Sequence, residues 1–248
     1  MVALSALFPD SRYTINTSVV NPLGVVMVYN TNIATVYNGG FCCLWTVPSN
    51  ATWAKFEVWG GGGGGGGACC CQQHAYSGGS GSYARKTIRV VPGQQYTICA
   101  GGSTCCSPTC LGQSGYPSYA CNPGATYPLC LCASGGYNGF SGCFCGYGQN
   151  SFVSCVYGSA CGYDFAICGV VHGFNGSTCG FHSWGYAPDP TYTGGGFRIG
   201  ADSCINLNAN NIAQAPFPGG GGMTSVSNGG GCCWGQVGAG GLVMITYK

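Results

Sequence analysis

Short apolar and aromatic runs, bounded by glycine, proline or asparagine, divide this chain into expected β-strands. The run 83–91 (YARKTIRVV) alternates between apolar and polar positions, which is typical of a half-exposed strand. A Pro92-Gly93 turn signal and the run 95–100 follow, so we expect these two strands to form a hairpin. No glycine-free stretch of about ten residues shows the helical period, which predicts an all-β fold. The other expected strands are 25–29, 33–37, 41–47, 53–59 and 242–247.

The strand 53–59 runs directly into the stretch around which the chain is organised, FEVWGGGGGGGG at 56–67. By the two-residue period, Phe56 and Val58 share one face of the strand and Glu57 lies on the other. A run without side chains lets backbones approach closely, as in collagen. We therefore favour a left-handed, polyglycine-II-like segment packed beside others of its kind over a flexible spacer. The glycines assigned to this packing are Gly60, Gly61, Gly62, Gly63, Gly64, Gly65, Gly66 and Gly67.

Glycine blocks and cysteines recur together at the other end of the chain. The stretch 219–241 leads into the last strand as the first block follows strand 53–59. The region 101–241 contains short aromatic or apolar triplets separated by glycine and cysteine, without an exact repeat. We expect ordered loops and very short strands there, held by disulfides and by glycine packing.

The composition limits the classes of protein that the chain can belong to. Its 248 residues include 48 glycines, and 46% are hydrophobic, so the chain can bury enough apolar surface to fold. Only 5% are charged, against about 25% in an ordinary domain. A net charge of +2 without a basic run argues against nucleic-acid binding. So few charges favour association, and we expect a homo-oligomer, with a trimer among the options.

The 21 cysteines approach the level of disulfide-rich secreted proteins, yet the start of the chain has no signal-peptide pattern. No apolar run approaches the ~20 residues of a membrane helix, so membrane insertion is not expected. The high cysteine content and the missing signal-peptide pattern are both expected of a protein that is made in the cytosol and later exposed to an oxidising medium. A virion protein released by lysis is an example of such a protein.

The cysteine spacing favours disulfides over metal. No two cysteines stand in the C-x-x-C relation of structural zinc sites, although His74 follows Cys71 by three residues. Adjacent cysteines cannot easily bridge each other, so each would reach a different loop. We expect no metal and no cofactor. The disulfide candidates are Cys42, Cys43, Cys69, Cys70, Cys71, Cys105, Cys106, Cys110, Cys232 and Cys233.

The sequence patterns that would indicate catalytic residues are weak. A cysteine nucleophile with His172 or His182 is conceivable, with Asp164, Asp189 or Asp202 as the orienting carboxylate, but no recognisable motif contains them. Five acidic residues scattered over the chain give no carboxylate pair for glycoside cleavage. We therefore expect that the protein is not an enzyme.

Two other groups of residues have alternative interpretations. Arg85, Lys86 and Arg89 suit either an anion or sugar-acid contact or a solvated strand face, which we favour. A set of aromatics expected in loops either packs as small cores or forms an interface or receptor contact. This set comprises Tyr116, Tyr119, Tyr137, Tyr147, Phe181, Trp184, Tyr186 and Tyr192, and the possible receptor or interface residues are Tyr137, Tyr147, Phe181, Trp184 and Tyr186.

The order of these pieces resembles the glycine-rich domain of tailed-phage virion proteins, found in tail-fibre adhesins and minor tail proteins. The resemblance rests on LWTVP (44–48), FEVWGGGGGGGG, the segment 83–102 and the final GAGGLVMITYK, and it covers about 39–248. The cysteine-studded motifs GGFCCLWTVP, GGGGACCC and GGGCCWG look like the glycine-rich structural proteins of cyanophages.

The resemblance implies a small β-sandwich-like scaffold with long polyglycine-II-like loops, here stapled by disulfides. It predicts an N-terminal attachment segment at 1–38 with short strands, followed by a glycine- and cysteine-rich β domain at 39–248. The expected function is that of a non-enzymatic virion structural protein at a tail fibre or fibre tip, on the outer surface of the particle. Its expected partners are other virion proteins and a host-surface glycan or protein. The alternative is a head-decoration or head-fibre protein with a purely structural role.

Overall fold

A computed structural model describes residues 25–29, 40–65, 78–102, 113–138, 162–167, 218–221 and 237–248 of the chain, and these contain nine strands and no helix. The strands follow the expected apolar runs for 25–29, 41–46, 53–59, 83–89, 95–100 and 242–247. The nine strands are β1 (Val25–Tyr29), β2 (Phe41–Thr46), β3 (Trp53–Trp59), β4 (Tyr83–Arg89), β5 (Gln95–Ala100), β6 (Ser118–Asn122), β7 (Leu129–Ala133), β8 (Phe165–Ile167) and β9 (Leu242–Tyr247).

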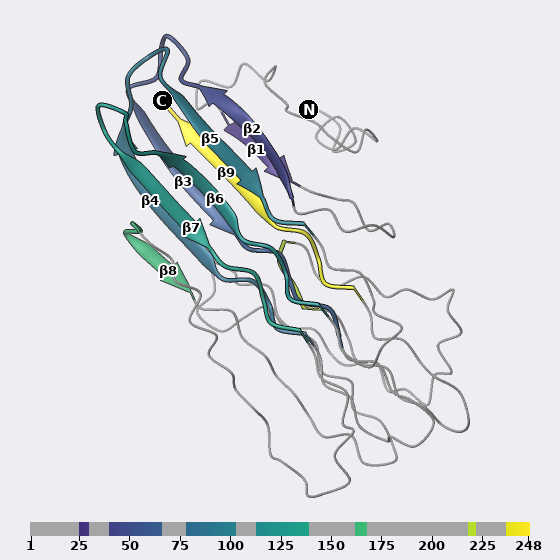
Figure 1. The fold of residues 1–248 in the computed structure, drawn as a ribbon. Coiled ribbons are helices and arrows are strands. Elements are labelled where there is room, and N and C mark those ends of the chain that lie inside the picture. The colour runs from purple at the N-terminus through teal and green to yellow at the C-terminus, as the bar shows by residue number, and fades with distance from the viewer. Residues whose placement is uncertain are drawn as a thin grey trace, which may run out of the picture.

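These strands form two antiparallel sheets that pack face to face (Figure 1). Sheet A has the order β1-β9-β3-β4-β8, and sheet B has the order β2-β5-β6-β7. The predicted fold class is confirmed: the chain is all-β, with a sandwich-like scaffold, polyglycine-II-like segments and a disulfide. In the part of the chain that the structure describes, no helix is long and apolar enough to span a membrane.

The expected hairpin of 83–91 with 95–100 is wrong, because β4 and β5 belong to different sheets. The connection between them crosses from one sheet to the other. Val90 N donates to Thr52 O on one side (3.0 Å), and Gly93 N donates to Val47 O on the other (2.9 Å). The apolar Val90 is buried at this crossing, so its burial drives the chain over the end of the core.

A hairpin that the sequence did not predict lies in the long glycine region instead. It joins β6 and β7, in direct register from Ser118↔Ala133 to Asn122↔Leu129. Asn122 Oδ1 accepts a hydrogen bond from Gly124 N (2.9 Å), the side-chain-to-backbone contact that favours asparagine at turns.

The core lies between the sheets and is built on alternate positions of strands β2 to β7 and β9. Phe56 and Val58 of β3 face inward and are fully buried, as the two-residue period predicts. The Phe56 ring lies edge-on to the ring of Trp45, with centroids 5.6 Å apart, and 5.4 Å from the ring of Tyr96. Aromatic rings from both sheets therefore join in one cluster.

The predicted N-terminal segment 1–38 contributes an edge strand to this sandwich. Its strand β1 pairs with β9, from Val25↔Thr246 to Tyr29↔Leu242. The last strand, β9, thus lies between β1 and β3. The division at 38/39 and the attachment role of 1–38 stay predictions, and the expected strand 33–37 lies outside the described residues.

Replacement of the central aromatic ring tests this core. Phe56→Ala should lower the free energy of unfolding by about 3–5 kcal/mol, because it leaves a cavity between two rings that cannot close it. Leu44→Ala is the control, since Leu44 is 59% exposed, and it should change stability by less than about 0.5 kcal/mol. Urea unfolding followed by tryptophan fluorescence measures both. Equal losses would contradict the described core.

Candidate functional site: a glycine bundle at the end of the sandwich

The strands of the sandwich continue beyond its edge as extended glycine-rich segments that run side by side (Figure 1). We call this assembly the glycine bundle. It has a central segment, Gly60–Gly65, which follows β3 directly, and six ring segments around it. The ring segments are 78–82, 101–102, 113–117, 134–138, 218–221 and 237–241.

The backbone N–H groups of the central segment bind its neighbours with a period of three residues. Gly60 N donates to Ser82 O (2.9 Å) and Gly63 N to Gly79 O (2.9 Å), so both bind segment 78–82. Three residues per turn is the period of the polyglycine II helix. The remaining donors follow the same period: Gly61 N and Gly64 N bind Tyr116 O and Gln113 O in segment 113–117, and Gly62 N binds Ala239 O in segment 237–241.

The Cα atoms of the central segment face the other three ring segments. A Cβ atom built on Gly60 would lie closer than 3.0 Å to Ser134 O, and one built on Gly62 would lie equally close to Gly220 O. A Cβ on Gly61 would meet Gly102 O in the same way. Side-chain atoms do not come this close to backbone oxygens, so only glycine fits these positions. Along the central run, each residue therefore donates its N–H to one ring segment and packs its Cα atom against another.

The six ring segments also bond to one another and close the ring. Gly79 N donates to Tyr137 O, Gly115 N to Gly136 O, Gly241 N to Gly101 O, Ala239 N to Gly220 O and Gly81 N to Gly219 O, all at 2.7–2.8 Å. The sixth contact is between segments 101–102 and 113–117, where a Cβ on Gly101 would collide with Tyr116 O. The central backbone is therefore enclosed on all sides by other backbone.

Many positions of the ring segments also need glycine, because a Cβ there would collide with the central segment or with a neighbouring ring segment. Gly78 and Gly81, three residues apart, both lie against the central segment, and so does Gly238. Between such positions the ring carries other residues, such as Ser80 and Ala239. None of the central glycines has a positive φ, which gives the segment the left-handed sense of polyglycine II. Gly66 and Gly67 lie outside the described residues.

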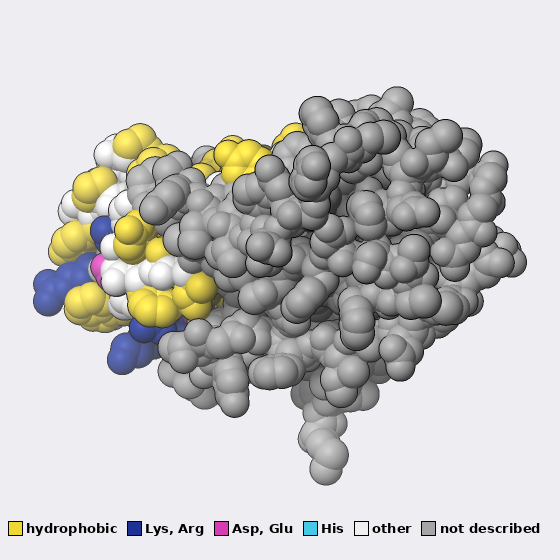
Figure 2. Space-filling model, turned by 90° about the horizontal axis from the view of Figure 1, so that it is seen from below, with side chains coloured by type: hydrophobic (Ala, Val, Ile, Leu, Met, Phe, Trp, Pro, Cys, Tyr) yellow, Lys and Arg dark blue, Asp and Glu magenta, His cyan; other side chains and the backbone are white. Residues whose placement is uncertain are grey.

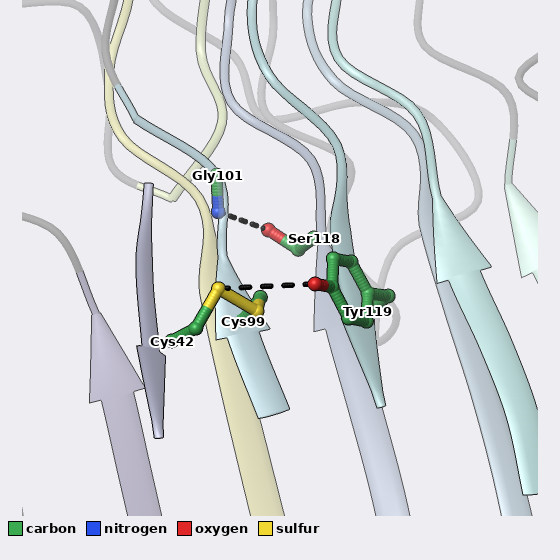
Figure 3. The surroundings of a disulfide bond; sticks show 5 residues. All are labelled: Cys42, Cys99, Gly101, Ser118 and Tyr119. Carbon is green, nitrogen blue, oxygen red and sulfur yellow. Dashed lines mark hydrogen bonds between the residues drawn. A yellow bond between two sulfur atoms is a disulfide. The ribbon is translucent and has the colours of Figure 1, made fainter. Parts of the chain in front are cut away.

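Two buried serines tie the bundle to the sandwich. Ser118 at the start of β6 accepts a hydrogen bond from Gly101 N (2.8 Å), as Figure 3 shows. It also donates one to Trp59 O (2.5 Å), so it links the ends of β5 and β3. Ser82, before β4, donates from its Oγ to Ser134 O (3.2 Å), after β7. Neither serine was predicted from the sequence, although Ser82 directly precedes β4 and Ser118 is the first residue of β6.

One disulfide is present in the described residues, and it joins strands, not loops. Cys42 of β2 is bonded to Cys99, the residue directly opposite it on β5, and Cys42 Sγ lies 3.8 Å from the Tyr119 hydroxyl (Figure 3). Cys43, its neighbour among the candidates, is a thiol in this structure, because adjacent strand residues point to opposite faces and only Cys42 faces Cys99. Burial raises the pKa of the Cys43 thiol.

The other disulfide candidates lie outside the described residues: Cys69, Cys70, Cys71, Cys105, Cys106, Cys110, Cys232 and Cys233. Cys99 was not among the cysteines predicted to form disulfides. Its signal was available in the strand run 95–100, because a cysteine within a strand can bridge directly to the neighbouring strand.

The structure places three of the eight aromatics that were expected in loops. Tyr137 lies in ring segment 134–138 and is 52% exposed. Tyr116 is half-buried in segment 113–117. The loop assignment of Tyr119 is wrong, because it lies on β6 beside the disulfide. Tyr147, Phe181, Trp184, Tyr186 and Tyr192 lie outside the described residues.

A buried carboxylate lies on the outer face of sheet A, close to the bundle. Glu57 is 4% exposed, accepts a hydrogen bond from the Tyr83 hydroxyl (2.7 Å) and forms an ion pair with Lys55 (2.7 Å). Tyr83 itself packs against Trp59, with ring centroids 4.7 Å apart. Burial, together with the hydrogen bond to Glu57, raises the pKa of Tyr83 above its usual range. The tyrosine is therefore held neutral as a donor to the carboxylate.

Basic side chains gather at one margin of the described part (Figure 2). On β4, Arg85 lies over the Phe165 ring (4.8 Å) and Arg89 over the Trp53 ring (5.2 Å), and both arginines are exposed. This exposure fits a solvated strand face, and the anion contact stays a prediction. Asp164, considered above as an orienting carboxylate, accepts a hydrogen bond from Thr87 N (2.9 Å).

No group of three or more His, Cys, Asp or Glu side chains within the described ranges could hold a metal ion. His74, His172 and His182 lie outside them. What the geometry does provide is a rigid backbone assembly that extends the sandwich.

The fold and the bundle define a β-sandwich protein with an extension made of packed polyglycine-II segments. By its sequence, the chain belongs to the glycine-rich domain family, whose profile matches residues 35–248. The match includes the sandwich from β2 onward and all seven segments of the bundle. Among curated proteins, none matches the chain significantly.

A single methyl group tests the bundle. Gly62→Ala should lower the free energy of unfolding by about 3 kcal/mol or more, because the new Cβ would collide with two backbone carbonyls that cannot rotate away. Gly124→Ala, in the β6–β7 turn, is the matched control, since its Cβ would meet only a side-chain oxygen at 3.7 Å. Urea unfolding of both variants gives the comparison, and equal midpoints would rule out the packed bundle.

Removal of the Tyr83 hydroxyl tests the buried carboxylate. Tyr83→Phe should lower stability at pH 7 by about 2 kcal/mol, because Glu57 loses a buried donor. A raised pKa in the folded state means that the stabilisation is complete below the unfolded pKa of about 10 and is lost at higher pH. The difference from the wild type should therefore shrink above pH 10. Unfolding curves at several pH values measure this, and a difference that grows in alkali would contradict the assignment.

Proposed function

We propose that this protein is a non-enzymatic structural protein of a phage particle, at a tail fibre or fibre tip, where it takes part in attachment to the host. The cyanophage-like cysteine motifs suggest that the host is a cyanobacterium. The observation that carries the proposal is the glycine bundle, a rigid extension whose strength comes from backbone packing alone. Its partners would be other virion proteins, further copies of the chain, and a glycan or protein of the host surface.

The direction of the bundle supports a projecting role. The central segment leaves the sandwich at the end of β3, and its six glycines Gly60–Gly65 extend roughly 19 Å in this conformation. Ring segments leave or enter at the same edge of the sandwich, so the bundle extends away from the opposite edge, where the β6–β7 turn lies. A body with a rigid extension suits a fibre component that holds contact residues away from the particle.

The exposure of Tyr137 supports contact at the end of the extension. This tyrosine is 52% exposed in segment 134–138, whereas the backbone around it is enclosed. An exposed ring with a polar tip suits stacking on a sugar or packing in a protein interface.

Location on the particle is the first test. A labelled antibody against the protein should mark the tail fibres or the tail tip in the electron microscope. Label spread over the head would replace the proposal with the decoration alternative. Absence of label from purified particles would overturn a virion role.

A pair of tyrosine variants tests the contact end. Particles with Tyr137→Ala should adsorb to host cells at least about fivefold more slowly, because loss of a central aromatic contact costs about 1–3 kcal/mol. Tyr127→Ala removes a comparably exposed ring (37%) from the β6–β7 turn at the opposite end, and adsorption should not change. Equal adsorption by both mutant particles and the wild type would contradict host contact through Tyr137.

A further inference from the structure

We propose that Cys121 and Cys130 form a second cross-strand disulfide, on the outer face of sheet B, that locks the β6–β7 hairpin to which two ring segments of the glycine bundle are attached. This inference rests on the register of sheet B and does not depend on the proposed function. Neither cysteine was among the candidates selected from the sequence.

The two cysteines lie directly opposite each other. Cys121 of β6 pairs with Cys130 of β7, just as Cys42 pairs with Cys99 between β2 and β5. Directly opposed residues of an antiparallel pair point to the same face. Cys130 is exposed and Cys121 half-buried. Cys132 on the same face lies opposite Tyr119, so Cys121–Cys130 is the pair of β6 and β7 that brings two cysteines together.

The register also decides the type of each pair. Opposed residues alternate between hydrogen-bonded pairs, with Cα atoms about 5.5 Å apart, and non-hydrogen-bonded pairs, at about 4.5 Å. Cys42 and Cys99, with Cα atoms 4.0 Å apart, form a pair of the closer type. Within a sheet, each residue directs its N–H and C=O to one neighbouring strand only. Cys99 does not bond to β2 at this position, so its pair with Tyr119 of β6 is hydrogen-bonded. Tyr119 thus bonds to β5, and its pair with Cys132 of β7 is not hydrogen-bonded.

The same type recurs every second residue along a strand, which makes Cys121↔Cys130 a non-hydrogen-bonded pair as well. The two cysteine pairs therefore occupy equivalent positions in the sheet. At such positions the opposed Cβ atoms approach most closely, within the range that a disulfide requires. Cys121 and Cys130 are not joined by a disulfide in this structure, and the inference rests on their register, which matches that of Cys42 and Cys99.

The chemistry is an ordinary exchange with a disulfide oxidant such as oxidised glutathione. The exposed Cys130 thiolate attacks one sulfur of the oxidant and releases one glutathione thiolate. The Cys121 thiolate then attacks the Cys130 sulfur of the mixed disulfide and releases the second. Two cysteines lose two electrons and two protons, and the oxidant gains them as two glutathione thiols. The reaction needs an oxidising medium, in which such a disulfide forms and persists.

The consequence lies at the junction with the glycine bundle. Strand β6 follows segment 113–117, and β7 leads into segment 134–138. Both segments contact the central glycines, through Gly115 and Ser134. A covalent link across β6 and β7 would hold this part of the ring in register. The Cys42–Cys99 disulfide does the same for β5, which leads into segment 101–102.

Disulfide mapping of the full-length, unaltered protein tests this inference. The protein is equilibrated in a glutathione buffer oxidising enough to keep Cys42–Cys99 closed, thiols are blocked with an alkylating reagent, and the chain is cleaved between Cys121 and Cys130. Mass spectrometry should find the peptides that contain these two residues joined, two hydrogens lighter than their sum, and separated after reduction.

Two outcomes would overturn the inference: alkylation of both cysteines while Cys42–Cys99 stays closed, or linkage of either cysteine to a different partner. Variants provide a control that does not depend on mapping alone. Cys130→Ser should add one alkylated thiol at Cys121, whereas Cys43→Ser, which removes a cysteine from the inner face of β2, should leave the Cys121–Cys130 peptide unchanged.

Discussion

The structure depends on one constraint: a backbone with three residues per turn can bind six neighbours only if all its residues are glycine. In the central segment, N–H groups point toward three ring segments and Cα atoms toward the other three. Each added Cβ would collide with a carbonyl of a ring segment, as at Gly60 or Gly62. The uninterrupted run Gly60–Gly65 follows from this geometry, whereas the ring segments carry other residues, such as Ser80 and Ala239, between their glycines.

The sandwich supplies the order that the glycine bundle needs. Strands β3, β5 and β7 run toward the bundle, and β4, β6 and β9 run back from it. Their continuations therefore alternate in direction around the central segment. The strand pairing fixes where each segment starts, and the buried Ser118 joins the ends of β3 and β5 at that boundary. Core packing around Phe56 and backbone packing around Gly62 thus stabilise one continuous body.

The alternating apolar runs predicted most of the strands, because inward positions such as Phe56 and Val58 must be buried wherever the strand lies. They could not predict which sheet each strand joins, so the turn after Arg89 was misread as a hairpin although Val90 crosses between sheets. The hairpin β6–β7 was missed because its strands are short and rich in cysteine. The long glycine run was enough to predict the central segment of the glycine bundle. The ring could have been found from glycines three residues apart, such as Gly78 and Gly81 or Gly238 and Gly241.

Amide hydrogen exchange of the central glycines tests the enclosed bundle most directly. With glycine labelled selectively by nitrogen-15, the N–H groups of Gly60–Gly64 can be followed one by one by NMR. Each donates a hydrogen bond inside a ring of backbone, so their exchange should be as slow as that of core strand amides such as those of β3. Exchange at the rate of an unstructured chain would mean that these glycines form a flexible spacer, and would contradict the account.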